Sequence, residues 1–191
     1  MVVLQLASVL ISLLCFSAAA PPMEDCSQLN KSLTMDELDK ILGRWIFIQG
    51  LANHETSTIV KTMTLKTSAN NDTLLMVQEI QYEENAMCIP VPMNFTLSGS
   101  TIQLKRGDSS NTAYFLQSCT DCLVMYTLDS GFGKKYEFLN IYGRTGNLTE
   151  SDLDHTRKQA ECLGFEPLHM FNSEPGSCPT PQNQTSHVKE E

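Results

Sequence analysis

The chain has 191 residues and a formal net charge of −9, which comes from 22 acidic and 13 basic side chains. This acidity argues against nucleic acid or an anionic membrane as a partner, because both bind basic surfaces. The length suits a single domain with a sizeable hydrophobic core.

The two ends of the chain differ in composition from the part between them. Residues 1–20 hold no charged side chain and end in a Ser-Ala-Ala-Ala run, which predicts a secretory signal peptide cut near Ala19 or Ala20. Their apolar run is too short for a membrane span. Residues 179–191 are polar and are expected to form a disordered tail. This leaves 21–178 as the domain of a secreted, extracellular protein of blood plasma or another body fluid.

Two helices are predicted, one on each side of a long β-rich region. The spacing of Thr34 and Glu37 is that of a capping box and predicts a short helix that ends near Gly43. Thr149 begins a longer helix, acidic in its first turn, that Gly164 can end. One narrow apolar stripe on this helix suits packing against the outside of a barrel. The stripe contains Leu153, Thr156, Ala160 and Leu163.

Between the two helices the sequence consists of eight short β-rich runs. Turn clusters such as Ser98-Gly99-Ser100 separate the runs, and no helical pattern lies between them. This arrangement predicts an antiparallel meander, closed as a barrel or folded as a sandwich. The runs cover roughly residues 45–52, 58–67, 73–82, 91–98, 100–106, 112–118, 122–129 and 135–142.

Six cysteines remain once Cys15 is removed with the signal, and an even number outside the cell predicts disulfides. Cys119 and Cys122 are the first and last residues of a four-residue turn, whose end Cα atoms lie within about 7 Å, a distance that a disulfide can span. A thioredoxin-type redox site would need a helix N-terminus in a βαβ unit. The spacing therefore favours a local structural bridge over redox activity or other pairings.

Asparagine sequons recur along the chain. Five of them in a secreted protein predict heavy glycosylation. They are Asn30, Asn71, Asn94, Asn147 and Asn183.

The residues at the two ends of the β-rich region resemble those of the lipocalins. Gly43-x-Trp45 opens the first strand, and Arg144 follows the last strand before a C-terminal helix. The resemblance implies an all-β fold: an eight-stranded antiparallel up-and-down barrel with that helix packed outside. It also implies that Trp45 lies across the closed end with Arg144 over its indole ring. The motif of core lipocalins that is expected near Thr127 to Asp129 is absent, which identifies an outlier lipocalin.

Within the lipocalins, the order of the cysteines is similar to that of the alpha-1-acid glycoprotein group. The chain looks most like the fish members of this group that bind tributyltin, saxitoxin and tetrodotoxin. This resemblance implies the bridges Cys26–Cys162 and Cys88–Cys178.

No catalytic, metal or cofactor site is expected. The four histidines are scattered over a loop, the second helix and the tail, and no pair of them has the spacing of metal ligands. No Ser or Cys comes with a base at a recognisable catalytic spacing. The histidines are His54, His155, His169 and His187.

Alternation along the strands predicts which side chains face the cup of the barrel. An inward Tyr142 leaves Leu139 and Ile141 to face the C-terminal helix, and a glycan on Asn94 would require Phe95 to point inward. Polar residues in the predicted set favour an open, hydrated cup over a packed core, which would leave them unsatisfied. The predicted ligand-binding set is Phe47, Gln49, Met76, Gln78, Ile80, Phe95, Ile102, Leu104, Val124, Tyr126, Leu128, Phe138, Asn140 and Tyr142.

The sequence as a whole predicts a secreted, glycosylated, monomeric carrier. Its partner would be a small hydrophobic or amphiphilic ligand that is bound without being transformed. Two alternatives stay open at this point. One is an enzyme on the same fold, an isomerase or a redox catalyst, and the other is a ligand-free interaction or inhibitor module.

Overall fold

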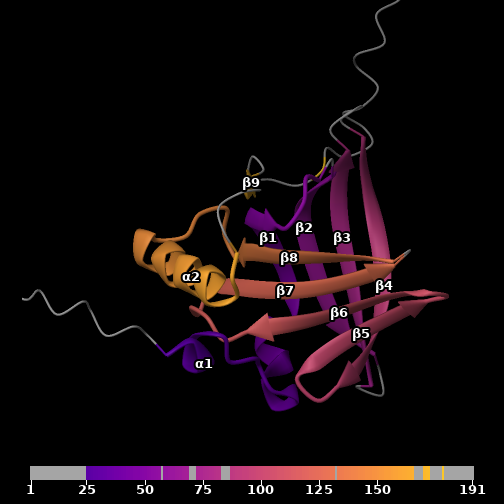
Figure 1. Cartoon of the computed structure of the whole chain (residues 1–191), viewed down its shortest axis with the longest axis horizontal. Coiled ribbons are helices and arrows are strands. Elements are labelled where there is room, and N and C mark those ends of the chain that lie inside the picture. Colours follow the sequence, from indigo (N-terminus) through magenta and orange to yellow (C-terminus); the bar gives the residue numbers. More distant parts are fainter. Residues whose placement is uncertain are drawn as a thin grey trace, which may run out of the picture.

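Eight antiparallel strands form a closed barrel, in which each strand pairs with the next along the chain and β1 pairs with both β2 and β8. Figure 1 shows the barrel with helix α2 outside its wall. The fold class is the one that the sequence predicts. The computed structural model describes residues 25–56, 58–68, 72–82, 87–131, 133–165, 170–172 and 178. The predicted signal peptide (1–20) and tail (179–191) lie outside these residues.

The strands follow the predicted runs closely. A ninth strand, β9, was not predicted and pairs with β1. The strands are β1 (Gly43–Ala52), β2 (Thr58–Thr67), β3 (Thr73–Tyr82), β4 (Cys88–Ser98), β5 (Thr101–Arg106), β6 (Ser109–Leu116), β7 (Cys122–Gly131), β8 (Lys134–Gly143) and β9 (Met170–Asn172). The helices are α1 (Cys26–Leu29), the 3-10 helix η1 (Met35–Ile41) and α2 (Glu150–Cys162). Among the described residues, no helix has the length and hydrophobicity to span a membrane.

Strand β4 begins earlier than predicted, at Cys88, although it contains Pro90 and Pro92. Proline cannot donate a ladder hydrogen bond and is confined to unpaired strand edges. Here β4 pairs with β3 along most of its length, but with β5 only from Thr96 to Ser98. The prolines are tolerated because the neighbouring β5 ladder does not extend to them.

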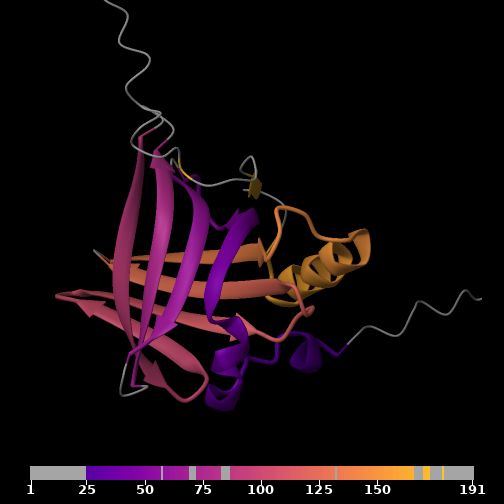
Figure 2. The same cartoon turned by 180° about the vertical axis from the view of Figure 1, so that it is seen from behind.

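Helix α2 packs against the outer wall formed by β1, β7 and β8, as both views of the molecule show (Figures 1 and 2). Leu51, Val124, Leu139 and Ile141 of these strands form a buried cluster with Ala160 of the helix. Burial of this apolar surface, rather than the intrinsic helix propensity, is the main stabilisation of such a helix. The structure therefore agrees with the prediction that Leu139 and Ile141 face the helix.

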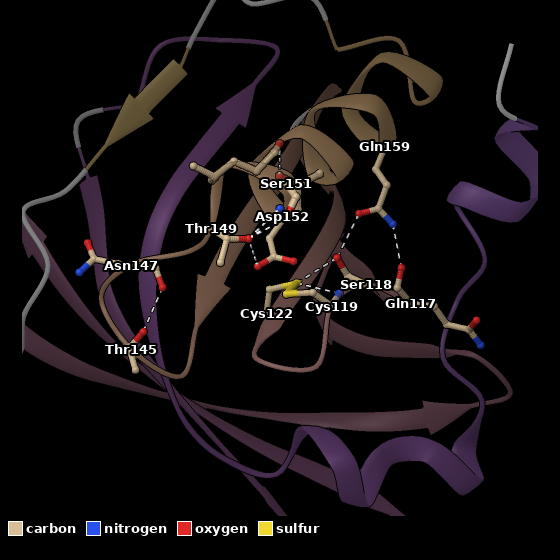
Figure 3. The surroundings of a disulfide bond; sticks show 12 residues. Gln117, Ser118, Cys119, Cys122, Thr145, Asn147, Thr149, Ser151, Asp152 and Gln159 are labelled. Carbon is tan, nitrogen blue, oxygen red and sulfur yellow. Dashed lines mark hydrogen bonds between the residues drawn. A yellow bond between two sulfur atoms is a disulfide. The ribbon is translucent and has the colours of Figure 1, made fainter. Parts of the chain in front are cut away.

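The most buried polar residue of α2 is Gln159, which is 0% exposed. Its amide nitrogen donates to the carbonyl oxygens of Leu29 (2.6 Å) and Gln117 (2.9 Å), and Ser118 lies 3.5 Å from its oxygen. Figure 3 shows Gln159 directed at Gln117 and Ser118. These bonds connect α2 to α1 and to the β6–β7 loop.

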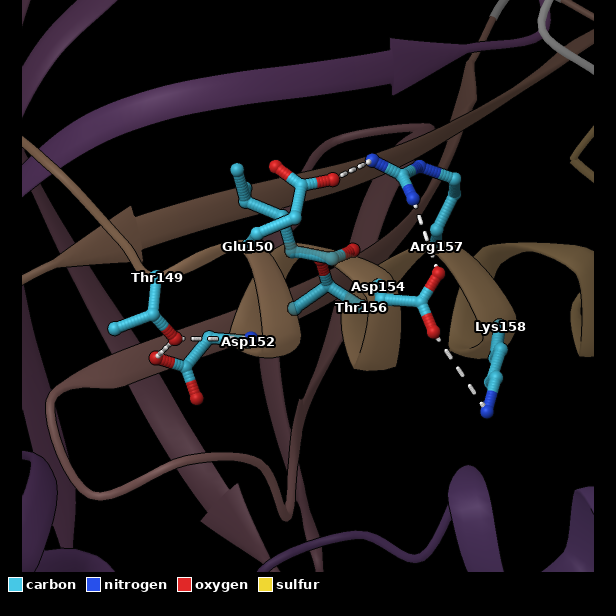
Figure 4. Close-up of polar contacts among 8 residues, drawn as sticks. Thr149, Glu150, Asp152, Asp154, Thr156, Arg157 and Lys158 are labelled. Atoms are coloured by element: carbon cyan, nitrogen blue, oxygen red, sulfur yellow. Dashed lines mark hydrogen bonds and ion pairs between the residues drawn. The ribbon is translucent and has the colours of Figure 1, made fainter.

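The polar face of α2 holds only exposed contacts. Thr149 accepts the Asp152 N–H at the N-terminus (3.2 Å), while Arg157 pairs with Glu150 (3.3 Å) and Asp154 (3.0 Å) (Figure 4). Exposed pairs of this kind contribute about 0–1 kcal/mol. They solubilise the helix but do not position it.

Three disulfides join the six cysteines of the described residues. Cys26–Cys162 links α1 to the end of α2, and Cys88–Cys178 links the start of β4 to the C-terminal segment. Cys119–Cys122 closes the short loop before β7 (Figure 3). These are the expected pairings, including the local one.

Candidate ligand-binding cup

The closed end of the barrel is built around Trp45 at the start of β1, which is 1% exposed. The guanidinium of Arg144 lies 3.6 Å from the centre of its ring, a cation–π contact. The indole N–H donates to the Ile41 carbonyl at 2.7 Å. The two residues have the arrangement that the lipocalin resemblance implies.

Arg144 also connects the strand ends to the preceding 3-10 helix. Its guanidinium donates to the backbone carbonyls of Arg44 (3.1 Å) and Lys40 (3.0 Å). Partial burial lowers its pKa, and the nearby Asp121 carboxylate acts in the opposite direction. Gly43 has φ +95°, and a Cβ there would stand 3.4 Å from the guanidinium. A glycine at this position meets both the backbone conformation and the close approach.

A packed layer covers Trp45 on its inner side. Phe47 and Tyr142 are both 0% exposed and their rings meet edge to face, with centroids 5.6 Å apart. Gln78 donates to the Tyr142 hydroxyl at 3.4 Å. Burial raises the pKa of Tyr142 well above its usual value. This end of the barrel interior is filled by side chains.

The other end of the barrel interior holds a cavity of about 170 Å³. Eight of the lining side chains are apolar and six are neutral and polar, and none of these fourteen is charged. The lining consists of Thr56, Thr58, Val60, Met76, Gln78, Ile80, Met93, Phe95, Asn111, Ala113, Met125, Thr127, Phe138 and Asn140.

Three of the lining residues carry polar atoms that are shielded from water and have no hydrogen-bond partner among the described residues. They are the side-chain oxygens of Asn111, Thr127 and Asn140, on the adjacent strands β6, β7 and β8. Buried polar side-chain atoms are nearly always hydrogen-bonded. Three such exceptions therefore lie on one wall of this cavity.

Comparison with known proteins identifies the family. Residues 17–181 match the family model described as the ApoM domain. The chain belongs to the ApoM domain family. Saxitoxin and tetrodotoxin-binding protein 1 of Takifugu pardalis is 28% identical over 172 aligned positions, which cover 77% of this ApoM-domain chain. The chain spans only 42% of the length of that relative.

Solved structures with the same fold are lipocalins and odorant-binding proteins. The bovine lipocalin allergen Bos d 2 superposes with a TM-score of 0.59 over 70% of this chain and 92% of its own, at 13% identity. An odorant-binding protein, OBP1, gives a TM-score of 0.60 over 75% and 94% of the two chains, at 11% identity. Identities this low establish a shared fold. The ApoM-domain chain therefore has the lipocalin fold.

Ten of the fourteen predicted cup residues lie inside the ApoM-domain barrel. Six of them line the cavity: Met76, Gln78, Ile80, Phe95, Phe138 and Asn140. The other four belong to the packed interior and do not line it: Phe47, Ile102, Leu104 and Tyr142.

The prediction for Gln49 is wrong, because a β-bulge interrupts the alternation of β1. The pairing with β8 shifts between Phe47 and Gln49, so that Ile48 is an extra residue. A bulge places two residues opposite one and reverses the faces beyond it. Gln49 and Leu51 therefore lie in a crevice beside α2, outside the barrel.

The orientation predicted for β7 is also wrong. Val124 and Tyr126 pack on the outer wall near α2, and Leu128 shares their face by alternation. The Tyr126 ring stacks on Tyr114 (5.9 Å), and its hydroxyl donates to Glu137 at 3.3 Å. Burial, followed by the Glu137 charge, raises the pKa of Tyr126 to about 12. The hydroxyl thus finds its partner on the outer wall.

The reversed orientation of β7 brings Met125 and Thr127 to the cavity, and sequence reasoning missed both. The sequence also did not predict which residues of β2 and β6 face the barrel interior. The pairing supplies the missing information for β6, because Ala113 stands directly opposite Thr127 and opposite residues share a face. The cavity residues missed from the sequence are Thr56, Thr58, Val60, Met93, Asn111, Ala113, Met125 and Thr127.

His54 is the described histidine that lies nearest to the cup. His54 packs its ring on Tyr136 (4.4 Å) and Phe138 (5.0 Å) at the open end of the barrel. In the part of the chain that the structure describes, no three His, Cys, Asp or Glu residues stand close enough to hold a metal ion. His169 and His187 lie outside that part.

The sequon asparagines differ in exposure. Asn94 and Asn147 are exposed, and the neighbouring Phe95 points into the cavity as the sequence predicts. Asn30 is half-buried, with its side-chain oxygen shielded from water. Asn71 and Asn183 lie outside the described residues. Asn94 and Asn147 therefore remain the most accessible glycosylation candidates.

Proposed function

We propose that this ApoM-domain protein binds a small, largely apolar molecule in its cup and carries it without chemical change. Its family and its lipocalin fold support small-ligand binding. The observation that carries the proposal is the uneven filling of the barrel. An eight-stranded barrel can be filled by its own side chains or hold one small ligand, and here one end is packed while the other holds a cavity of about 170 Å³.

The lining suits a ligand that is mostly apolar with a few polar groups. Met76, Met93 and Met125 contribute flexible thioether side chains, which adapt to irregular shapes. Phe95 and Phe138 add aromatic surface, and the neutral polar residues can fix orientation. Saxitoxin and tetrodotoxin are candidate ligands because the Takifugu pardalis relative is named for them. Tributyltin is a further candidate, which the sequence resemblance supplies.

We further propose that the protein is a secreted, glycosylated monomer of blood plasma or another body fluid. Three disulfides support an oxidising, extracellular environment. The exposed sequons at Asn94 and Asn147 support glycosylation. The apolar composition of residues 1–20 supports secretion.

A carrier is favoured over a thiol-dependent enzyme by the state of the cysteines. Every cysteine of the described residues is in a disulfide, and a nucleophilic or redox thiol must be free to form the thiolate. A titration of free thiols in the folded secreted protein tests this point. The carrier predicts no reactive thiol, whereas a titratable and reactive thiol would support the enzyme.

A pair of adjacent residues on β8 tests the proposed function. Phe138 lines the cavity, and Leu139 is 0% exposed in the cluster under α2. The cup can hydrate a new charge, but a packed wall cannot do so without a large penalty. We expect Phe138→Glu to remove binding of the fluorescent apolar probe 1-aminonaphthalene while the thermal midpoint stays close to that of the wild type.

Leu139→Glu is the matched control, with the same charge introduced one residue away. It should lower the thermal midpoint strongly, and its folded fraction should still bind the probe. If both substitutions unfold the protein, the barrel is a packed core and the carrier proposal is wrong. The same conclusion follows if the folded wild-type protein does not bind the probe.

A further inference from the structure

The disulfide in the short loop before β7 lines a second cavity, which is separate from the cup. This cavity of about 430 Å³ lies at the closed end of the barrel, between η1 and the β6–β7 loop. Cys119 and Cys122 line it together with Trp45 and Lys40. Cys119 is half-buried, whereas Cys122 is 5% exposed. A small molecule in this cavity can therefore reach Cys119 more readily than Cys122.

The loop that carries this bridge is also held by hydrogen bonds. The backbone N–H of Arg144 donates to the Asp121 carbonyl at 2.9 Å, and the Gln159 amide donates to the Gln117 carbonyl at 2.9 Å. The bridge spans a sequence separation of only 3, against 136 and 90 for the other two bridges. A disulfide that closes a short loop stabilises a fold least. Opening this bridge should therefore leave the fold in place.

The sulfur of Cys122 lies among hydrogen-bonding groups that suit a reduced cysteine. The backbone N–H of Cys119 donates to it at 2.8 Å, and the Ser118 hydroxyl lies 3.1 Å from it (Figure 3). Both groups can donate to a thiolate, and the hydroxyl oxygen can accept from a thiol. The sulfur that is released when the bridge opens therefore has partners in either protonation state.

We propose that Cys119–Cys122 is a site of thiol–disulfide exchange, at which a small thiol opens this bridge while the other two stay closed. The inference goes beyond the proposed function and does not depend on it. The thiolate of the small thiol attacks the Cys119 sulfur and forms a mixed disulfide, and Cys122 leaves as a thiolate. A second thiolate attacks the small-molecule sulfur of the mixed disulfide and releases Cys119. The protein gains two electrons and two protons, and two small thiols become one disulfide.

The charges around this cavity offset one another, which favours an uncharged thiol. Lys40 pairs with Glu37 at 3.1 Å, and the charge of Asp121 attracts that of Arg144. The probe is therefore 2-mercaptoethanol. The folded protein is treated with it without denaturant, quenched with iodoacetamide at intervals and mapped by peptide mass spectrometry. We expect the bridge at the β6–β7 loop to be reduced and alkylated about tenfold faster than the other two bridges.

A matched pair of variants identifies the sulfur that is attacked. Cys122→Ser and Cys119→Ser each remove the bridge and leave one thiol. With 2-hydroxyethyl disulfide, the Cys122→Ser protein should form a mixed disulfide at Cys119 about tenfold faster than the Cys119→Ser protein forms one at the more buried Cys122. The double variant Cys119→Ser/Cys122→Ser should keep a thermal midpoint close to that of the wild type, because hydrogen bonds still hold the loop.

Reduction of all three bridges at the same rate, or of another bridge first, would overturn the proposal. Equal rates for the two single variants would overturn the attack on Cys119, and a double variant that does not fold would show that the bridge is purely structural. In each case 1-aminonaphthalene would still bind to the oxidised wild-type protein, and the carrier function would stand. A wild-type protein that opens this bridge first but does not bind 1-aminonaphthalene would keep the exchange site and lose the carrier function.

Discussion

The closed and open ends of the barrel differ in whether their buried polar side-chain atoms have hydrogen-bond partners. At the closed end the indole N–H of Trp45 and the guanidinium of Arg144 donate to backbone carbonyls at 2.7–3.1 Å. At the open end the side-chain oxygens of Asn111, Thr127 and Asn140 have no partner among the described residues. One sheet therefore holds a satisfied, packed end and an unsatisfied, hollow end.

The difference shows where stability and function are separated in this molecule. A packed floor in which Trp45 and Arg144 find hydrogen-bond partners fixes the shape of the strands, so it contributes to folding. A cavity with unpartnered acceptors costs folding free energy. Substitutions at the open end are therefore expected to lower the free energy of unfolding little, or even to raise it, while they weaken ligand binding. Residues at the closed end should show the reverse.

The largest expected effect lies at the closed end. Trp45→Ala removes a ring that is 1% exposed and should lower the free energy of unfolding by roughly 3–5 kcal/mol. Phe138→Ala at the open end should cost much less, about 1 kcal/mol, because its half-buried ring already borders a cavity. Urea denaturation of the two variants measures the difference. Equal losses would mean that the two ends are packed alike.

A smaller effect, an increase in stability, is expected for a substitution at the open end. Thr127→Val replaces an unpartnered buried hydroxyl by a methyl group of the same shape and should stabilise the unliganded protein by about 1 kcal/mol. Thr62→Val is the control, because Thr62 is also a buried residue but its hydroxyl donates to Glu79 at 2.7 Å. It should be destabilising. A Thr127→Val protein that is as destabilised as Thr62→Val would show that Thr127 has a partner, such as an ordered water.

The smallest effect concerns pH. Hydrogen bonds from the Thr34 backbone and then from Lys40 lower the pKa of Glu37 from 4.5 to about 2. A carboxyl with a lowered pKa in the folded state stabilises the protein above pH 4.5, and this contribution is lost as the pH falls towards 2. Glu37→Gln should therefore weaken the wild type's acid-induced loss of stability between pH 4.5 and 2. An unchanged acid profile in thermal melts at several pH values would contradict this assignment.

The strand boundaries could be predicted from the sequence because turn residues mark them. Gly99 and Ser100 separate β4 from β5, and Cys119 to Asp121 lie directly before β7, as expected. The cavity faces of β3 and β8 could also be predicted, since alternation is unbroken there from Met76 to Ile80 and from Phe138 to Tyr142. Alternation is a reliable guide where one face is clearly polar or one residue is anchored.

The rest of the cup could not be predicted, for two physical reasons. The bulge at Ile48 leaves no signature in a run that is apolar on both faces, so the orientation of Gln49 was misjudged. On β7 both faces are buried, one in the barrel interior and one under α2. Val124 and Met125 are both apolar, so the sequence does not show which of them faces the interior. Only the tertiary packing of α2 decides between them.

The central claim is that a ligand occupies the open end of the barrel, and methyl NMR tests it most directly. Met76, Met93 and Met125 line the cavity, while Met87 is 48% exposed. With ¹³C-labelled methionine methyl groups, addition of 1-aminonaphthalene should shift the three cavity signals and leave Met87 unchanged. Shifts confined to Met87, or no shift of the cavity signals while the probe binds elsewhere, would contradict the account.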